Sequence, residues 1–136
     1  MEPEQEKARR TPIHDYRDLR AWQLSRHVVK AAYELTRRFP REEVYGLVQQ
    51  MQRASVSIAS NIAEGYGRGS LGDYIRFLLT ARGSLYELET QCVLAEDLEF
   101  VTPRETTTLR ARVEECARVL QGLINSLQAK GTARRR

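Results

Sequence analysis

Five polar residues between positions 53 and 68 have types and a spacing that suit a shared chemical task. Arg53, Ser57, Asn61, Glu64 and Arg68 follow one another at intervals of four, four, three and four residues. On a helix, this spacing places one hydroxyl, one amide and three charges in a single row. The row can join helices within one chain, join two protomers, or bind a ligand through Glu64, Asn61 and the arginines.

The segment that holds this row is predicted to be a helix with a closely packed opposite face. Apolar and small residues recur there at helical spacing: Met51, Ala54, Ser55, Ile58, Ala59, Ile62 and Ala63. Gly65, Gly67 and Gly69 follow and predict the end of the helix. The run GYGRGS resembles a phosphate-binding loop, but it follows a helix and lacks GKS or GKT. We therefore interpret it as a helix stop with a glycine hinge.

Other residues that often perform chemistry lack a supporting pattern. His14 and His27 are interpreted as ordinary surface or interface histidines. Cys92 and Cys116 each lie on an apolar helical stripe, which favours two reduced, buried thiols over a disulfide or redox pair. The sequence has no CxxC motif and no Cys/His cluster. We therefore predict no metal, no cofactor, no small-molecule substrate and no enzymatic activity.

Length and composition indicate one globular domain. The chain has 136 residues, of which 41% are hydrophobic. No apolar run approaches the ~20 residues that span a bilayer. The N-terminal segment is charged and has no apolar core, so it does not resemble a secretory signal. We expect a cytoplasmic protein without a membrane segment.

The basic charge of the chain lies mainly at its ends. The net charge is +4, and residues 1–11 and 129–136 hold seven basic against three acidic residues, which accounts for all of it. Residues 12–41 are basic and residues 42–101 are acidic. This asymmetry can steer RNA or DNA to one surface, pair protomers, or simply face solvent. The candidate nucleic-acid-binding residues on the first helix are Arg20, Arg26, Lys30, Arg37 and Arg38.

Hydrophobic periodicity predicts four long helices and no strands. The first begins at Asp15 or Asp18 and ends near Phe39; the second runs from about Arg41 to the glycine break. The third runs from about Leu71 to Leu98, and the last begins at the Thr102-Pro103 cap and ends before Gly131. These elements predict an all-α, antiparallel up-down-up-down bundle over residues 14–128, between a flexible arm (1–13) and a basic flexible tail (129–136).

The first and third helices have more apolar residues than one buried stripe requires. Gly83 lies in the middle of the third helix, where glycine costs ~1 kcal/mol relative to alanine, so we expect close contact with a neighbour there. Exposed apolar surface usually marks an interface. The sequence therefore predicts a homo-oligomer, with Gly83, Gly65 and the polar row as candidate interface residues.

Several segments resemble a known bacterial family. They are YRDLRAWQLS at 16–25, Phe39-Pro40, ASVSIASNIAEGYGR at 54–68, FLLTARGSLYELET at 77–90 and LAEDL at 94–98. They resemble the four-helix-bundle proteins encoded in intervening sequences of bacterial 23S ribosomal RNA genes. The resemblance covers about two thirds of the chain and does not extend to the arm, the fourth helix or the Arg-rich tail.

The resemblance implies a four-helix bundle that assembles as a ring-shaped homopentamer, without an assigned biochemical role. A related protein, the accessory variability determinant of diversity-generating retroelements, is a basic pentameric barrel that binds nucleic acid and a reverse transcriptase. Residues 12–128 of this chain carry equal numbers of basic and acidic residues, unlike that barrel. Two functions follow as hypotheses: an oligomeric scaffold that binds RNA or DNA through the first helix and the tails, or a protein-interaction ring without nucleic acid.

Overall fold

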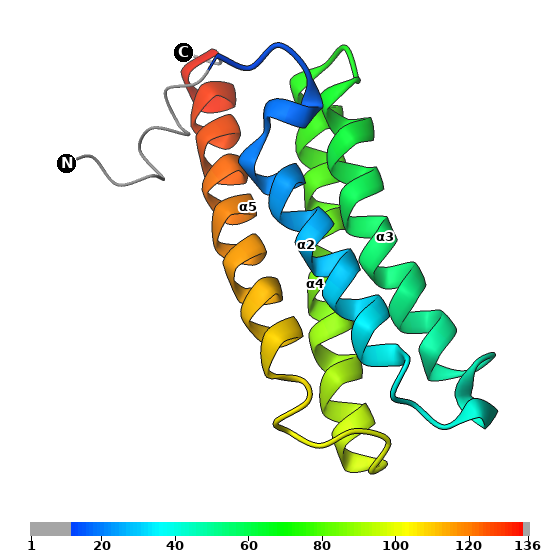
Figure 1. The fold of residues 1–136 in the computed structure, drawn as a ribbon. Helices are drawn as coiled ribbons and strands as arrows, with labels where there is room; N and C mark the ends of the chain where they lie inside the picture. The colour runs from blue at the N-terminus through cyan, green and yellow to red at the C-terminus, as the bar shows by residue number, and fades with distance from the viewer. Residues whose placement is uncertain (1–11, 135–136) are drawn as a thin grey trace.

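Four long helices form the body of the protein in the computed structural model, which describes residues 12–134 (Figure 1). They are α2 (Arg20–Thr36), α3 (Leu47–Tyr66), α4 (Leu71–Asp97) and α5 (Thr107–Arg134). Two short 3₁₀ helices, η1 (Tyr16–Asp18) and η2 (Arg41–Glu43), precede α2 and α3. No strand occurs among the described residues, which confirms the prediction of an all-α protein with four helices.

One apolar core holds the four helices together. Helices α3 and α5 each pack against both α2 and α4 (Figure 1). Every long helix contributes side chains that are fully enclosed, among them Val28, Ile58, Leu85 and Leu120. Burying one such side chain contributes about 1.5–3 kcal/mol, so the packed apolar faces stabilise the fold far more than the surface ion pairs do.

The predicted Asp15 cap forms, but it closes the 3₁₀ helix η1 and not α2, whose N-cap residue Leu19 makes no side-chain hydrogen bond. The Asp15 carboxylate accepts the backbone N–H of Arg17 at 2.7 Å, while the Asp18 carboxylate accepts the backbone N–H of Asp15 at 3.2 Å. These bonds close η1, and the regular helix begins two residues later, at Arg20. Helix α2 ends at Thr36, slightly before the predicted Phe39, because Pro40 disfavours helical geometry in the residue before it.

Further predicted helix boundaries are wrong, and α5 begins at Thr107 rather than at the Thr102-Pro103 cap. The second long helix begins at Leu47 rather than near Arg41, since η2 and the irregular backbone of Gly46 occupy the positions between. The last helix continues through Gly131 to Arg134 instead of ending before Gly131. A single glycine inside a helix costs only ~1 kcal/mol. Here the last turns stay helical, and the Thr132 hydroxyl donates to the Gln128 carbonyl at 3.1 Å.

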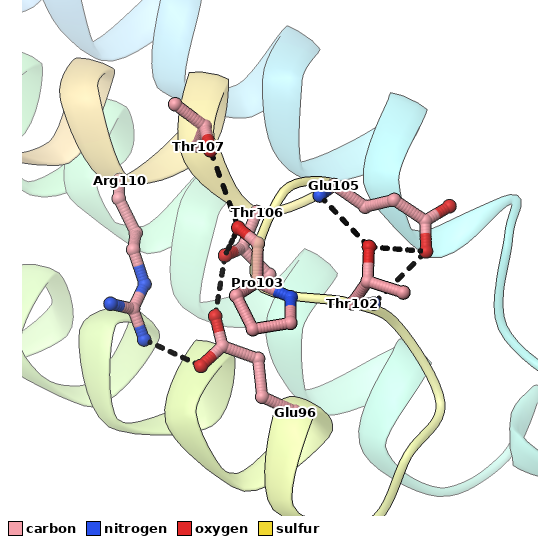
Figure 2. A network of polar contacts seen from close by, with 7 residues as sticks. All are labelled: Glu96, Thr102, Pro103, Glu105, Thr106, Thr107 and Arg110. Atoms are coloured by element: carbon pink, nitrogen blue, oxygen red, sulfur yellow. Dashed lines mark hydrogen bonds and ion pairs between the residues drawn. The ribbon is translucent and has the colours of Figure 1, made fainter.

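The connection from α4 to α5 is fixed by a polar network at one end of the bundle (Figure 2). The buried Thr106 hydroxyl lies 2.5 Å from Glu96 Oε1, and the Arg110 guanidinium donates to Glu96 Oε2 at 3.0 Å. The reciprocal bonds predicted for Thr102 and Glu105 are present, although the regular α-helix begins only at Thr107. This network joins the end of α4 to the first turn of α5.

A Schellman motif ends α4 with a glutamate where glycine is usual. The backbone N–H of Phe100 donates to the Ala95 carbonyl, and that of Glu99 donates to the Glu96 carbonyl, both at 2.9 Å. Glu99 has a φ of 60°, in the left-handed region that costs a residue with a Cβ atom about 1 kcal/mol. The motif is therefore formed at the expense of some backbone strain.

Glu99→Gly is expected to raise the free energy of unfolding by about 0.5–1 kcal/mol, because glycine adopts this conformation without strain. Chemical denaturation at a fixed protein concentration measures the change. Glu114→Gly, at an exposed position inside α5, is the matched control and should lower stability by about 1 kcal/mol. Equal destabilisation by the two substitutions would contradict the strain assigned to Glu99.

Candidate functional site

The middle of the predicted polar row joins α3 to α4 within one chain. The hydroxyls of Ser57 and Ser84 form a hydrogen bond of 2.9 Å. The Asn61 amide donates to the Ser57 carbonyl at 2.8 Å and lies 3.0 Å from its hydroxyl. Sequence reasoning did not pair Ser84 with the row. The one available signal was its place beside Gly83, in a stretch of small residues on the facing helix.

The C-terminal end of the polar row, at Glu64 and Arg68, forms a partly exposed cluster of charges. Arg68 pairs with Glu64 at 3.7 Å, and its guanidinium lies 4.7 Å from the centre of the Phe77 ring. Arg76 lies 5.1 Å from the same ring centre and pairs with Asp73 at 3.3 Å. Exposed pairs of this kind contribute little stability. The structure therefore separates Glu64 and Arg68 from the Ser57–Asn61–Ser84 link, and Arg53, on the exposed side of α3, belongs to neither.

Gly65 serves close packing rather than the predicted helix stop. Helix α3 continues through it, with Gly67 as the residue that caps the end. A Cβ atom at position 65 would lie 2.7 Å from the Phe77 Cβ and 3.2 Å from the Tyr74 carbonyl oxygen. Helix α4 therefore approaches α3 at a distance that only glycine permits.

Gly65→Ala is expected to lower the free energy of unfolding by about 1–3 kcal/mol, because the added methyl forces α3 and α4 apart. Gly83→Ala is the matched control, since no heavy atom lies within 4 Å of an added Cβ there. The control should leave the stability of the single chain unchanged or raise it by up to about 1 kcal/mol. Thermal unfolding compares the two, and an unaffected Gly65→Ala would contradict the assigned close contact.

The five basic candidates on α2 do not form one patch. Arg20 pairs with Glu115 at 3.6 Å, and Arg38 pairs with Glu105 at 3.1 Å, so both lie on the side of α2 that faces α5. The pKa of the Glu105 carboxyl is below its ordinary value, first because the Thr102 backbone N–H donates to it and also because Arg38 lies beside it. These acidic partners lie far away in the sequence, and sequence reasoning missed both.

The other three cations point away from the core. Arg26, Lys30 and Arg37 are exposed and stand four and seven residues apart, which places Arg26 and Lys30 on α2 in one row with Arg37, the C-cap residue of that helix. The Arg26 guanidinium lies 5.4 Å from the centre of the Trp22 ring. An open groove with a volume of about 430 Å³ lies between α2 and α3, and none of these three cations lines it. Its lining consists of Tyr33, Gln49, Gln52, Arg53, Val56, Ser57 and Ser60.

Helix α4 exposes a second apolar stripe on the side that the bundle does not cover. Tyr86 is 59% exposed and Val93, seven residues later, is 42% exposed, whereas Leu79, seven residues before Tyr86, is half-buried and packs against the core. A different face of the same helix fills the core with Leu78, Leu85, Leu88, Cys92 and Ala95. Gly83 lies near the exposed stripe, and an added Cβ would meet no atom of the same chain within 4 Å. Among the described residues, the close neighbour predicted for Gly83 is therefore not found.

Both cysteines are buried and form no disulfide, as predicted. Burial raises the pKa of the Cys92 thiol to about 11 and that of the Cys116 thiol to about 12. Both are thus protonated at neutral pH, which makes them poor nucleophiles. Within residues 12–134, no three His, Cys, Asp or Glu side chains gather as a metal site would require. None of the described helices combines the length and apolar character needed to cross a bilayer.

Comparison with protein families identifies the chain. A model of the 23S rRNA-intervening sequence protein family matches residues 17–122, which is well over half of the sequence. The chain belongs to this family. The match confirms the resemblance seen in the sequence and extends from η1 into α5, so it includes much of the helix that the sequence motifs did not cover.

A solved structure shares the fold of this protein. It is described as a protein of unknown function from the S23 ribosomal protein family of Bacteroides thetaiotaomicron. The two chains are 21% identical and superpose with a TM-score of 0.67, over 76% of this chain and 97% of the other. At this identity the similarity shows the fold alone. No curated protein matches the sequence.

Proposed function

We propose that this protein is a non-enzymatic helical scaffold, an antiparallel up-down-up-down bundle that assembles with copies of itself and binds RNA or DNA electrostatically. The exposed apolar stripe of α4 carries the assembly part of the proposal. The outward row of Arg26, Lys30 and Arg37 on α2 carries the nucleic-acid part. Family resemblance favours a ring of five subunits.

The spacing of the α4 stripe suits a helix-to-helix seam between protomers. Leu79, Tyr86 and Val93 repeat every seven residues, as the core positions of a coiled coil do. Four residues after Leu79 and Tyr86 come Gly83 and Thr90, which are small enough to let another helix approach. An exposed apolar patch along several turns of a helix is typical of an interface. The stripe therefore favours a second protomer packed along α4.

Gly83→Leu is expected to disrupt assembly, because a leucine would fill the space that a partner helix occupies. An added Cβ at this position has no heavy atom of a neighbouring element within 4 Å, so the start of the new side chain has room within the chain. Light scattering coupled to size-exclusion chromatography should show a smaller mass, while circular dichroism remains helical. Gly69→Leu, in the open turn after α3, is the control. Unchanged mass for Gly83→Leu would contradict an interface along this stripe.

The charges on α2 support nucleic-acid binding at one surface. Arg26, Lys30 and Arg37 are exposed, have no ion-pair partner among the described residues, and extend over roughly 16 Å at the helical rise of 1.5 Å per residue. Binding of phosphates by such cations is electrostatic and depends strongly on salt. Assembly would repeat the row once per subunit and so strengthen a weak contact by avidity.

The triple variant Arg26→Gln, Lys30→Gln and Arg37→Gln is expected to weaken binding of a labelled RNA by about tenfold or more at 0.1 M salt, with a shallower salt dependence. Fluorescence anisotropy measures both quantities. The control variant, Arg20→Gln with Arg38→Gln, removes two charges where the triple variant removes three. Its two arginines are paired with Glu115 and Glu105, so each charge removed should have a smaller effect on binding. Equal losses per charge would contradict the assignment of the outward row.

A protein-interaction ring without nucleic acid is the second candidate. The observation in its favour is the neutralisation of Arg20 and Arg38 by Glu115 and Glu105, which leaves three of the five predicted cations for a polyanion. Wild-type protein that assembles but shows no salt-dependent retention of RNA or DNA would favour this second function. The assembly part of the proposal would then remain.

A further inference from the structure

The groove between α2 and α3 contains more than the charges that electrostatic binding requires. Tyr33, on the α2 wall, is 39% exposed, which leaves part of its ring accessible beside the groove. Val56 provides apolar surface on the opposite wall, and Arg53, Gln49 and Ser60 provide hydrogen-bonding groups. An exposed aromatic ring among cations and polar side chains is the combination that binds unstacked bases.

One hydrogen bond joins the two walls of this groove, and a second bond within α2 continues it. The Gln52 amide donates to the Thr36 hydroxyl at 3.2 Å, and that hydroxyl in turn donates to the Tyr33 carbonyl at 3.1 Å. Thr36 is buried, so solvent does not compete freely for these bonds. Helices α2 and α3 lie side by side along this contact (Figure 1). The groove is therefore present before any ligand arrives, which lowers the cost of binding.

The cations stand beside Tyr33 rather than at a distance from it. Lys30 precedes it by three residues and Arg37 follows it by four, so one cation lies a turn before and one a turn after the ring. Arg26 continues the row by another turn, and Arg53 lines the groove from α3. A flexible strand of phosphates along the row could thus place a base on Tyr33 without leaving the cations.

We propose that the α2–α3 groove binds single-stranded nucleic acid, with a base stacked on Tyr33 and phosphates held by Lys30, Arg37 and Arg53. This inference rests on the proposed function and names its substrate class. A duplex keeps its base faces inside the stack and offers phosphates alone. An acidic polypeptide offers charge without a base to stack. The open groove and the accessible ring therefore favour a single strand over both.

The test uses the full chain and dye-labelled 12-nucleotide single strands of RNA and of DNA, with a 12-base-pair duplex for comparison, in fluorescence anisotropy at 0.1 M salt. Tyr33→Ala should weaken single-strand binding by about tenfold and leave duplex binding unchanged. Tyr33→Trp should retain single-strand binding. Tyr45→Ala, which removes a tyrosine that is 87% exposed in the loop before α3, is the matched control and should have no effect.

The outcomes separate this inference from the broader function. Unchanged single-strand binding by Tyr33→Ala overturns the stacking role, and salt-sensitive binding through the α2 cations would then leave the proposed function standing. Competition by polyglutamate as effective as that by an unlabelled strand of equal charge also overturns the inference and favours an acidic protein partner. Absence of wild-type binding to all three probes overturns both proposals. Circular dichroism and mass of each variant exclude misfolding as the cause.

Discussion

Helix α4 has apolar side chains on two faces, and both faces are more stable when they are removed from water. The rest of the arrangement depends on that constraint. One face fills the bundle core through Leu78, Leu85 and Leu88, where no solvent reaches. The other, with Tyr86 and Val93, is turned away from the core, while Leu79 on the same row is half-buried against it. A four-helix bundle covers only one face of each helix, so the second stripe remains in water unless another molecule covers it. The assembly that we propose would cover this stripe without any change in the fold.

The contacts around α4 show how the chain limits alternative uses of its polar residues. Gly65 lets α3 approach α4 closely, and Ser57, Asn61 and Ser84 bond across the same contact. The hydrogen bonds of these three side chains therefore join α3 to α4 at the centre of the polar row. The α5 carboxylates likewise pair with cations on one side of α2. What remains available is the outward side of α2, beside the groove that it shares with α3.

Helical periodicity and capping patterns predicted the number of helices well. They did not predict which side chains pair between helices. The number of helices, the Asp15 and Thr102 caps and the burial of both cysteines follow from periodicity and capping patterns. The role of Gly65 did not, because a glycine that allows close approach looks in sequence like one that ends a helix. The pairing of Arg20 with Glu115 and of Arg38 with Glu105 depends on which helices are neighbours. The groove beside Tyr33 exists only once two helices are side by side, so no single stretch of sequence encodes it.

The central claim is that a single chain leaves apolar surface on α4 that copies of the protein cover. Sedimentation equilibrium of the wild-type chain over a range of dilute concentrations tests it most directly. The account predicts one mass that is a multiple of 15.7 kDa, fivefold for the ring that the family resemblance implies. A uniform species of 15.7 kDa at every concentration would contradict the account, because the α4 stripe would then face water in the native protein.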